Sequence, residues 1–89
     1  MKIQIKKFGL ILVSRPAGRE AFLAASAYLP SPKKPDEPIE LDFEGVQVLA
    51  PSWADEFLSG LREKYRNPIK ILPTKNSSVI ESLKILDAA

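Results

Sequence analysis

The chain of 89 residues contains no cysteine and no histidine. Without cysteine it has no disulfide, thiol nucleophile or thiolate metal site. Without histidine it lacks the usual general base near neutral pH, the commonest metal ligand and every Ser-His-Asp or Cys-His relay. Catalysis would have to use carboxylates, Lys, Arg, Tyr or Ser alone. We therefore expect a protein that is not an enzyme and that has neither a metal site nor a cofactor.

Long apolar segments are also missing. No stretch approaches the roughly 18 uninterrupted apolar residues of a membrane helix. The opening MKIQIKKFGLILVSRP becomes polar too early, without a small-residue cleavage site, for a signal peptide. We expect a cytoplasmic chain without membrane contact. Its length and 45% hydrophobic content fit a single domain, residues 1–89, around one core.

Negative charge is scarce in the first part of the chain. Residues 1–35 carry seven Lys or Arg and one Glu, a balance of +6, whereas residues 36–89 carry six Lys or Arg and ten acids, a balance of −4. Such asymmetry is found in proteins that bind nucleic acid or acidic partners. The basic residues are scattered without interleaved aromatic side chains, so direct nucleic-acid binding is disfavoured.

The first third of the chain predicts two strands and a helix. Alternation at Ile3 and Ile5 and the run LILV at residues 10–13 indicate two strands, which we expect to form a hairpin around residues 7–9. Ser14 then caps a predicted helix that runs to about residue 29, because its hydroxyl can accept from exposed backbone N–H groups. Residues 30–38 hold four of the eight prolines and predict a loop.

The middle of the chain predicts a buried strand, a turn and an amphipathic helix. Residues 39–43, IELDF, alternate apolar and acidic side chains, and Gly45 permits the turn that follows. Ser52 and Asp55 have the spacing of a capping box, which predicts that the helix begins at Ser52 with Pro51 just outside it. Gly60 inside this helix indicates a close backbone approach on that side.

Residues 69–72 predict a short strand, and Ser78 with Glu81 predicts a second capping box before the last helix. Strands that alternate with helices after an opening hairpin are typical of an α/β fold. We expect a small mixed sheet of four to five strands, with the N-terminal hairpin first and the later strands parallel, and about three helices.

Two segments resemble a known family. They are LVSRPAGR, Leu12 to Arg19, and LDFEGVQVLAPSWADEFL, Leu41 to Leu58. The second is similar to the strand, glycine-containing turn and helix of STAS domains, the fold of sulfate transporters and anti-sigma-factor antagonists. Both together resemble a STAS-like family of unknown function, whose members pair an "LxSRxxAxR"-like segment with an "LDFxGVxxxxxxFADEL"-like one. The resemblance implies a STAS-like fold from residue 10 onward.

The resemblance also implies a regulatory role in bacteria. In the antagonists a serine at the helix start is phosphorylated, and here Pro51 occupies that position, with Ser52 at the second serine. Ser52 is therefore either a helix cap or a site of phosphorylation. Similar domains occur beside ATPases, kinases and transcription regulators, which makes such a protein the implied partner.

The other candidate residues near the helix start have two interpretations each. Asp55 and Glu56 point about 100° apart on a helix, so they do not converge on one substrate atom. Either of them pairs with Arg15 or Arg19 if the starts of the two helices meet. Trp53 is either an exposed anchor for a partner or part of the core.

We therefore predict a docking surface for another protein at the turn and helix start, residues 45–57. Its candidate residues are Arg15, Arg19, Pro51, Ser52, Trp53, Asp55 and Glu56. One alternative is an antagonist-type regulator switched by phosphorylation of Ser52. Another is a small domain that binds an anion or nucleotide near Asp42, Ser14 and Arg15.

Overall fold

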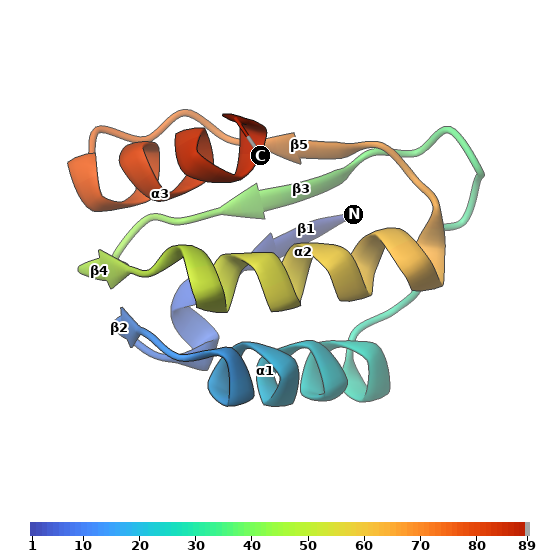
Figure 1. Cartoon of the computed structure of the whole chain (residues 1–89). Helices are drawn as coiled ribbons and strands as arrows, with labels where there is room; N and C mark the ends of the chain where they lie inside the picture. The colour runs from blue at the N-terminus through green and yellow to red at the C-terminus, as the bar shows by residue number, and fades with distance from the viewer. Residues whose placement is uncertain (89) are drawn as a thin grey trace.

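The computed structural model describes the backbone of residues 1–88 and the side chains of residues 1–86. It shows a small α/β domain with three helices and five short strands (Figure 1). The predicted α/β class is therefore confirmed. In chain order the elements are β1 (Lys2–Gln4), the 3₁₀ turn η1 (Ile5–Phe8), β2 (Ile11–Leu12), α1 (Arg15–Tyr28), β3 (Ile39–Asp42), β4 (Val48–Leu49), α2 (Pro51–Tyr65), β5 (Ile69–Ile71) and α3 (Ser77–Ala88).

The strands form two small sheets, and the predicted N-terminal hairpin is wrong. β1 pairs with β3 and β3 pairs with β5, which gives the order β1-β3-β5, while β2 pairs with β4 in a separate sheet. All of these pairs are parallel, so the expected mixed sheet is also wrong. The reason is that η1 buries Ile5 completely and carries the chain onward instead of reversing it. β1 instead pairs with β3, whose inward side chains Ile39 and Leu41 are fully buried.

The three-stranded sheet has one apolar and one polar face. Ile3, Ile39 and Leu41 point into the core, whereas Lys2 and Lys70 on the other face are exposed. α1 packs beside α2, and α3 packs against α2 and β4 (Figure 1). The helices thus cover the apolar face, and the molecule has two layers. No helix within residues 1–88 is long and apolar enough to cross a bilayer.

α1 begins as the sequence predicts. The Ser14 hydroxyl accepts a hydrogen bond from the Ala17 N–H at 3.3 Å, and Pro16 lies in the first turn. A further feature of this turn is the close contact of α1 with α2 at Gly18. A Cβ at Gly18 would lie 2.5 Å from the backbone oxygen of Trp53, so only glycine fits this position without a shift of the backbone.

α3 begins differently from the prediction. Asn76, and not Ser78, caps the helix, because its Oδ1 accepts from the Val79 N–H at 3.2 Å. Ser78 instead contacts β4: its hydroxyl accepts from the Leu49 N–H at 3.0 Å and donates to the Leu49 carbonyl at 3.2 Å. The expected capping box with Glu81 is therefore wrong, since Ser78 lies inside the first turn and forms hydrogen bonds with a strand.

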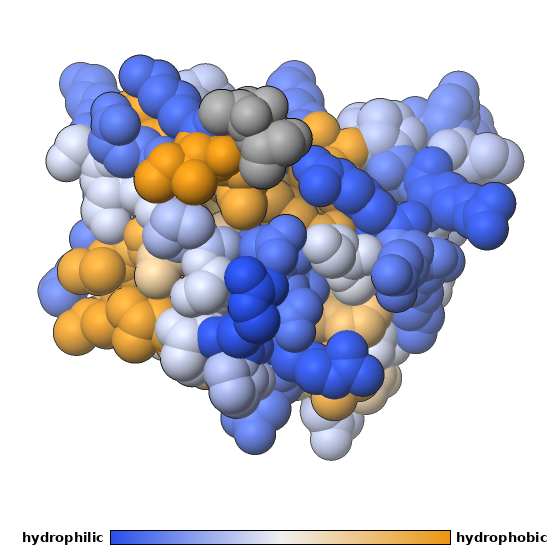
Figure 2. Space-filling view, viewed as in Figure 1, coloured by the Kyte–Doolittle hydropathy of each residue, from blue (hydrophilic) through white to orange (hydrophobic). Residues whose placement is uncertain are grey.

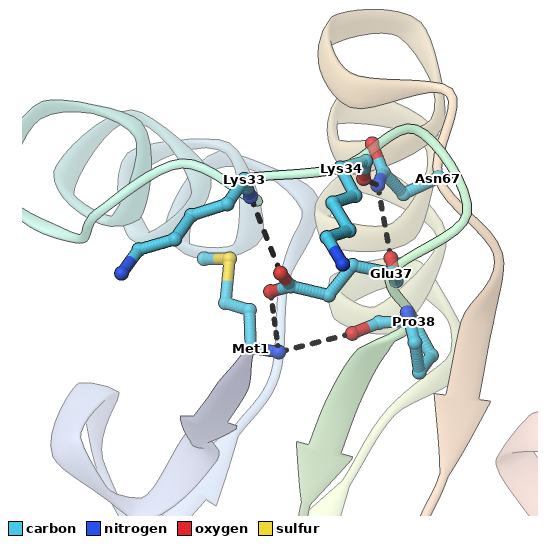
Figure 3. Close-up of polar contacts among 6 residues, drawn as sticks. All are labelled: Met1, Lys33, Lys34, Glu37, Pro38 and Asn67. Carbon is cyan, nitrogen blue, oxygen red and sulfur yellow. Dashed lines mark hydrogen bonds and ion pairs between the residues drawn. The ribbon is translucent and has the colours of Figure 1, made fainter.

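The proline-rich segment between α1 and β3 is a loop, as predicted, and side chains hold it in place (Figure 3). The Glu37 carboxylate accepts from the Met1 amino group at 2.9 Å and from the Lys33 N–H at 3.3 Å. The Asn67 side-chain amide donates to the Lys34 and Glu37 carbonyls at 2.8 and 2.9 Å. The amino group lowers the pKa of Glu37 below its ordinary value, because it donates a hydrogen bond to the ionised carboxylate.

Candidate functional site

The predicted site residues come from two helices that start at the same end of the molecule. The first turns of α1 and α2 lie beside β2 and β4 (Figure 1). Each helix directly follows its strand: β2 is separated from α1 by two residues, and β4 is separated from α2 by Ala50 alone. Because β2 and β4 pair in parallel, both helix starts are brought to one edge. We call this region the β2–β4 end.

Arg15 and Asp55 join the two helix starts, as one interpretation of the sequence predicted. Arg15 Nη1 donates to Asp55 Oδ2 at 2.6 Å, and both side chains are about half exposed. The guanidinium lowers the pKa of Asp55 below its ordinary value, because it donates to the ionised carboxylate, and the Ser59 hydroxyl adds a weaker effect. Asp55 is thus held as a carboxylate, which suits an ion pair and not a general acid.

The start of α2 differs from the predicted capping box. The helix begins at Pro51 with Ala50 at the N-cap, and no side chain caps it. Pro51 suits this first position because its fixed φ is helical and its missing N–H would have no partner there. Ser52 therefore lies in the first turn, half-buried, and its hydroxyl makes no hydrogen bond within the described part of the chain. The interpretation of Ser52 as a cap is wrong.

Trp53 belongs to the core. Its side chain is 2% exposed and stacks on Phe57 with ring centroids 5.0 Å apart, and Phe8 lies against both rings. It therefore does not present an anchor to a partner, contrary to its place among the candidate docking residues. It contributes indirectly, since its backbone holds α1 at Gly18.

The other candidates are accessible. Arg19 is exposed, and Pro51 and Glu56 are half-buried. Among the described side chains, residues 1–86, neither Arg19 nor Glu56 forms an ion pair at the β2–β4 end. The structure thus brings together Arg15, Asp55 and the first turn of α2, with Arg19 one turn further along α1.

An exposed apolar surface at the same end was missed by the sequence reasoning. We call it the β2–β4 patch. Leu12 and Leu49 of the two strands point inward and are each 2% exposed, but the alternate side chains are also apolar. Figure 2 shows hydrophobic atoms gathered where Figure 1 places β2 and β4. The patch consists of Leu10 (47% exposed), Ile11 (63%), Val13 (45%) and Val48 (41%).

A signal for this patch is present in the sequence. A strand with one solvent face normally alternates apolar and polar residues, whereas LILV is apolar at every position. Such a run is typical of a strand buried on both faces. In this chain one face stays uncovered, so the apolar side chains on it are exposed.

The residues proposed for an anion pocket do not share a cavity. Asp42 Oδ2 lies 3.6 Å from Lys2 Nζ, and Asp42 Oδ1 accepts from the Glu44 N–H at 3.0 Å. The cavity at Asp42, of about 320 Å³, is lined by residues 42–46 and 73–76, and neither Ser14 nor Arg15 lines it. The cavity at Asp42 therefore does not include the other two residues of the anion or nucleotide alternative.

Comparison with known proteins gives a family. Residues 28–81, more than half of the chain, match the model of the STAS-like domain of unknown function (DUF4325). No curated protein and no solved structure matches the chain. The matched segment begins after LVSRPAGR and contains β3, β4, α2 and β5, with the turn at Gly45 and the start of α2. The chain belongs to the family of STAS-like domains of unknown function.

Proposed function

We propose that this domain is a non-enzymatic interaction module that docks a signalling or transcription-regulatory protein through its β2–β4 end. The docking surface combines the turn and helix start at residues 45–57 with the first turn of α1. The observation that carries the proposal is the exposed β2–β4 patch, which lies beside charged side chains of both helix starts.

The composition of this surface supports docking of a protein. Interfaces commonly have an apolar centre and a polar rim. Here four exposed aliphatic side chains form the centre, and Arg15, Arg19, Asp55 and Glu56 supply charge nearby. The ion pair between Arg15 and Asp55 fixes the two helix starts relative to each other, so that a partner meets a preformed surface.

A role without catalysis is supported by the chemistry of the same end. The chain has no histidine or cysteine. Asp55 is engaged by Arg15, and its lowered pKa keeps it ionised near neutral pH. A general acid or base works best with a pKa near the working pH, and Asp55 is shifted the opposite way.

Photo-crosslinking in the native host tests the proposal. A benzophenone amino acid is introduced at Val48, in the patch, and at Ile85 of α3, which is also an exposed apolar residue (56%). We expect the Val48 variant to crosslink to a distinct protein and the Ile85 variant to give no such product. Equal crosslinking at both positions, or no crosslinking at Val48, would overturn the proposal.

A second candidate function is a phosphorylation switch at Ser52. The observation in its favour is that the Ser52 hydroxyl does not cap α2 and is half-buried in the first helical turn. A phosphate there would lie at the positive end of the helix dipole, although the nearby carboxylates Asp55 and Glu56 oppose it. Phosphoproteomics of the native protein, with Ser52→Ala as the control, tests this candidate. Absence of Ser52 phosphate in all growth conditions would contradict it.

A further inference from the structure

β2 has one paired edge and one open edge. On the paired side the Leu10 and Leu12 carbonyls accept from N–H groups of β4 and of Ala50, at 3.1 and 2.8 Å. Across a trans peptide bond the next N–H points opposite to the carbonyl, and residues 1–88 contain no cis bond. The N–H groups of Ile11 and Val13 therefore point away from β4, and no described residue accepts a hydrogen bond from them.

The other edge of the same small sheet is closed. The Leu49 N–H donates to Ser78 Oγ, and the Leu49 carbonyl accepts from the hydroxyls of Ser78 and Ser82. These two serines of α3 take the place of a neighbouring strand along β4. The two-stranded sheet is thus satisfied on the β4 side and open on the β2 side.

The open edge lacks the features that protect most sheet edges. Exposed edge strands commonly carry a lysine, a proline or a bulge that prevents pairing with another chain. Residues 10–13 contain no lysine and no proline, and the side chains of Ile11 and Val13 are 63% and 45% exposed. The strand is short and ends at Ser14, whose φ of 83° turns the backbone into α1. An added strand would therefore pair over a few residues.

The positive charges that flank β2 in the sequence favour a partner of opposite charge. From Lys6 to Arg19 the chain carries four positive side chains and no negative one. Arg15 is paired with Asp55, whereas Lys6, Lys7 and Arg19 form no ion pair with any of the described side chains of residues 1–86. A second copy paired along this edge would bring two such segments together, and like charges would repel. A segment with acidic ends would instead be attracted.

We infer that the open edge of β2 accepts an extended segment of a partner protein as an added β-strand. The segment is apolar at alternate positions, where its side chains extend the β2–β4 patch, and acidic at its ends, which suits the excess of positive charge from Lys6 to Arg19. Main-chain hydrogen bonds to Ile11 and Val13 provide affinity, and the charges fix its identity. This inference rests on the proposed function, because it specifies what docks at the β2–β4 end.

Binding of a labelled synthetic peptide, measured by fluorescence anisotropy, tests the inference. The probe has valine at alternate positions, threonine between them and two glutamates at each end. One control peptide has lysines in place of the glutamates, and another carries N-methyl groups on alternate backbone amides. We expect the acidic peptide to bind at low salt and each control peptide to bind at least tenfold more weakly.

A Val13→Pro variant of the domain tests whether the open edge of β2 forms these hydrogen bonds. Proline removes the outward N–H and leaves the pairing with β4 intact, since the lost N–H points away from β4. We expect at least a tenfold loss of peptide affinity, and a smaller loss for Val13→Thr, which keeps the N–H. If the Val13→Pro variant does not fold, the N-methylated peptide tests the same main-chain hydrogen bonds with the unaltered domain.

The outcomes separate this inference from the proposed function. Absent peptide binding, or binding that neither proline nor N-methylation weakens, overturns strand addition, even where Val48 still crosslinks to a partner. A dimer in analytical ultracentrifugation that Val13→Pro dissociates would also overturn it, because the occupant is then a second copy. The proposed function itself fails only when the crosslinks at the patch are absent or unspecific.

Discussion

Gly60 of α2 faces the ring of Phe22 of α1 so closely that a Cβ at this position would lie 2.6 Å from a ring carbon. The sequence predicted a close backbone approach at Gly60; another element does come close there, but the approaching group is an aromatic side chain and not a backbone. Gly18 makes the reciprocal contact from α1, with the backbone of Trp53 as its neighbour. These two glycines set the distance between α1 and α2 and hence the arrangement of the β2–β4 end.

Gly18→Ala is expected to destabilise the domain by about 1–3 kcal/mol, the usual cost of overpacking. Alanine normally stabilises a helix interior by about 1 kcal/mol over glycine, but here its methyl group would collide with a backbone carbonyl. Gly60→Ala should cost less, because the half-buried Phe22 ring can move. Urea denaturation measures the stability of both variants. As a control, Ala27→Gly at an exposed position of α1 measures the intrinsic difference between alanine and glycine in a helix. A Gly18→Ala domain as stable as the unaltered one would contradict the close contact.

Ser14 combines a helix cap with a strained backbone. Its φ of 83° is rare for a residue with a Cβ, and its hydroxyl caps α1. Ser14→Ala loses the cap and keeps the strain, so we expect a loss of about 1 kcal/mol. Ser14→Gly also loses the hydroxyl but relieves the strain, so its stability should stay close to that of the unaltered domain. Thermal unfolding of the two variants checks the order, and a less stable glycine variant would disprove the account.

Ser78 and Ser82 both form hydrogen bonds with the backbone of Leu49, but Ser78 forms more of them. Ser78→Ala removes the partner of the Leu49 N–H and one donor to its carbonyl, which leaves a buried donor unsatisfied at a cost of about 1–3 kcal/mol. Ser82→Ala removes only a donor to the carbonyl, which Ser78 still serves. We expect the first variant to be the less stable of the two in chemical denaturation. Faster amide exchange at Leu49 in Ser78→Ala alone would give local confirmation; the reverse order would count against it.

The ion pair of Arg15 and Asp55 should make stability depend on pH. The unfolded pKa of Asp55 is about 3.9, and the folded pKa lies below it. The contribution of Asp55 to stability is therefore present above the unfolded pKa and is lost as pH falls through the folded pKa. The stability difference between the unaltered domain and Asp55→Asn should therefore shrink as pH falls from 7 into this range. Urea denaturation at several pH values measures it.

The control for this pair is a double-mutant cycle. In an Arg15→Gln background, Asp55→Asn should have little pH-dependent effect, because the donor that lowers the pKa is gone. The coupling should also weaken with salt, since both side chains are about half exposed. If the effect of Asp55→Asn on stability still depended on pH in the absence of Arg15, the pH dependence would come from another group.

Much of the fold followed from local patterns. Alternation of apolar residues predicted β3, the apolar stripe predicted α2, and the prolines predicted the loop before β3. Each of these signals lies within one element, where spacing alone decides which side chains share a face. The predicted ion pair between the helix starts also required only that the two helices begin at the same edge, which parallel strands ensure.

The sequence by itself determined the α/β class, the three helices, four of the five strands, and the pairing of Arg15 with Asp55 at the β2–β4 end. The tertiary structure alone decided which strands pair, that β2 joins β4 instead of β1, and that Ser52 and Ser78 lie inside their helices. Strand pairing and helix start depend on competition between distant partners, and local propensity cannot rank them. The open edge of β2 emerged only from this pairing, because a strand's free side is set by its neighbours and not by its own residues.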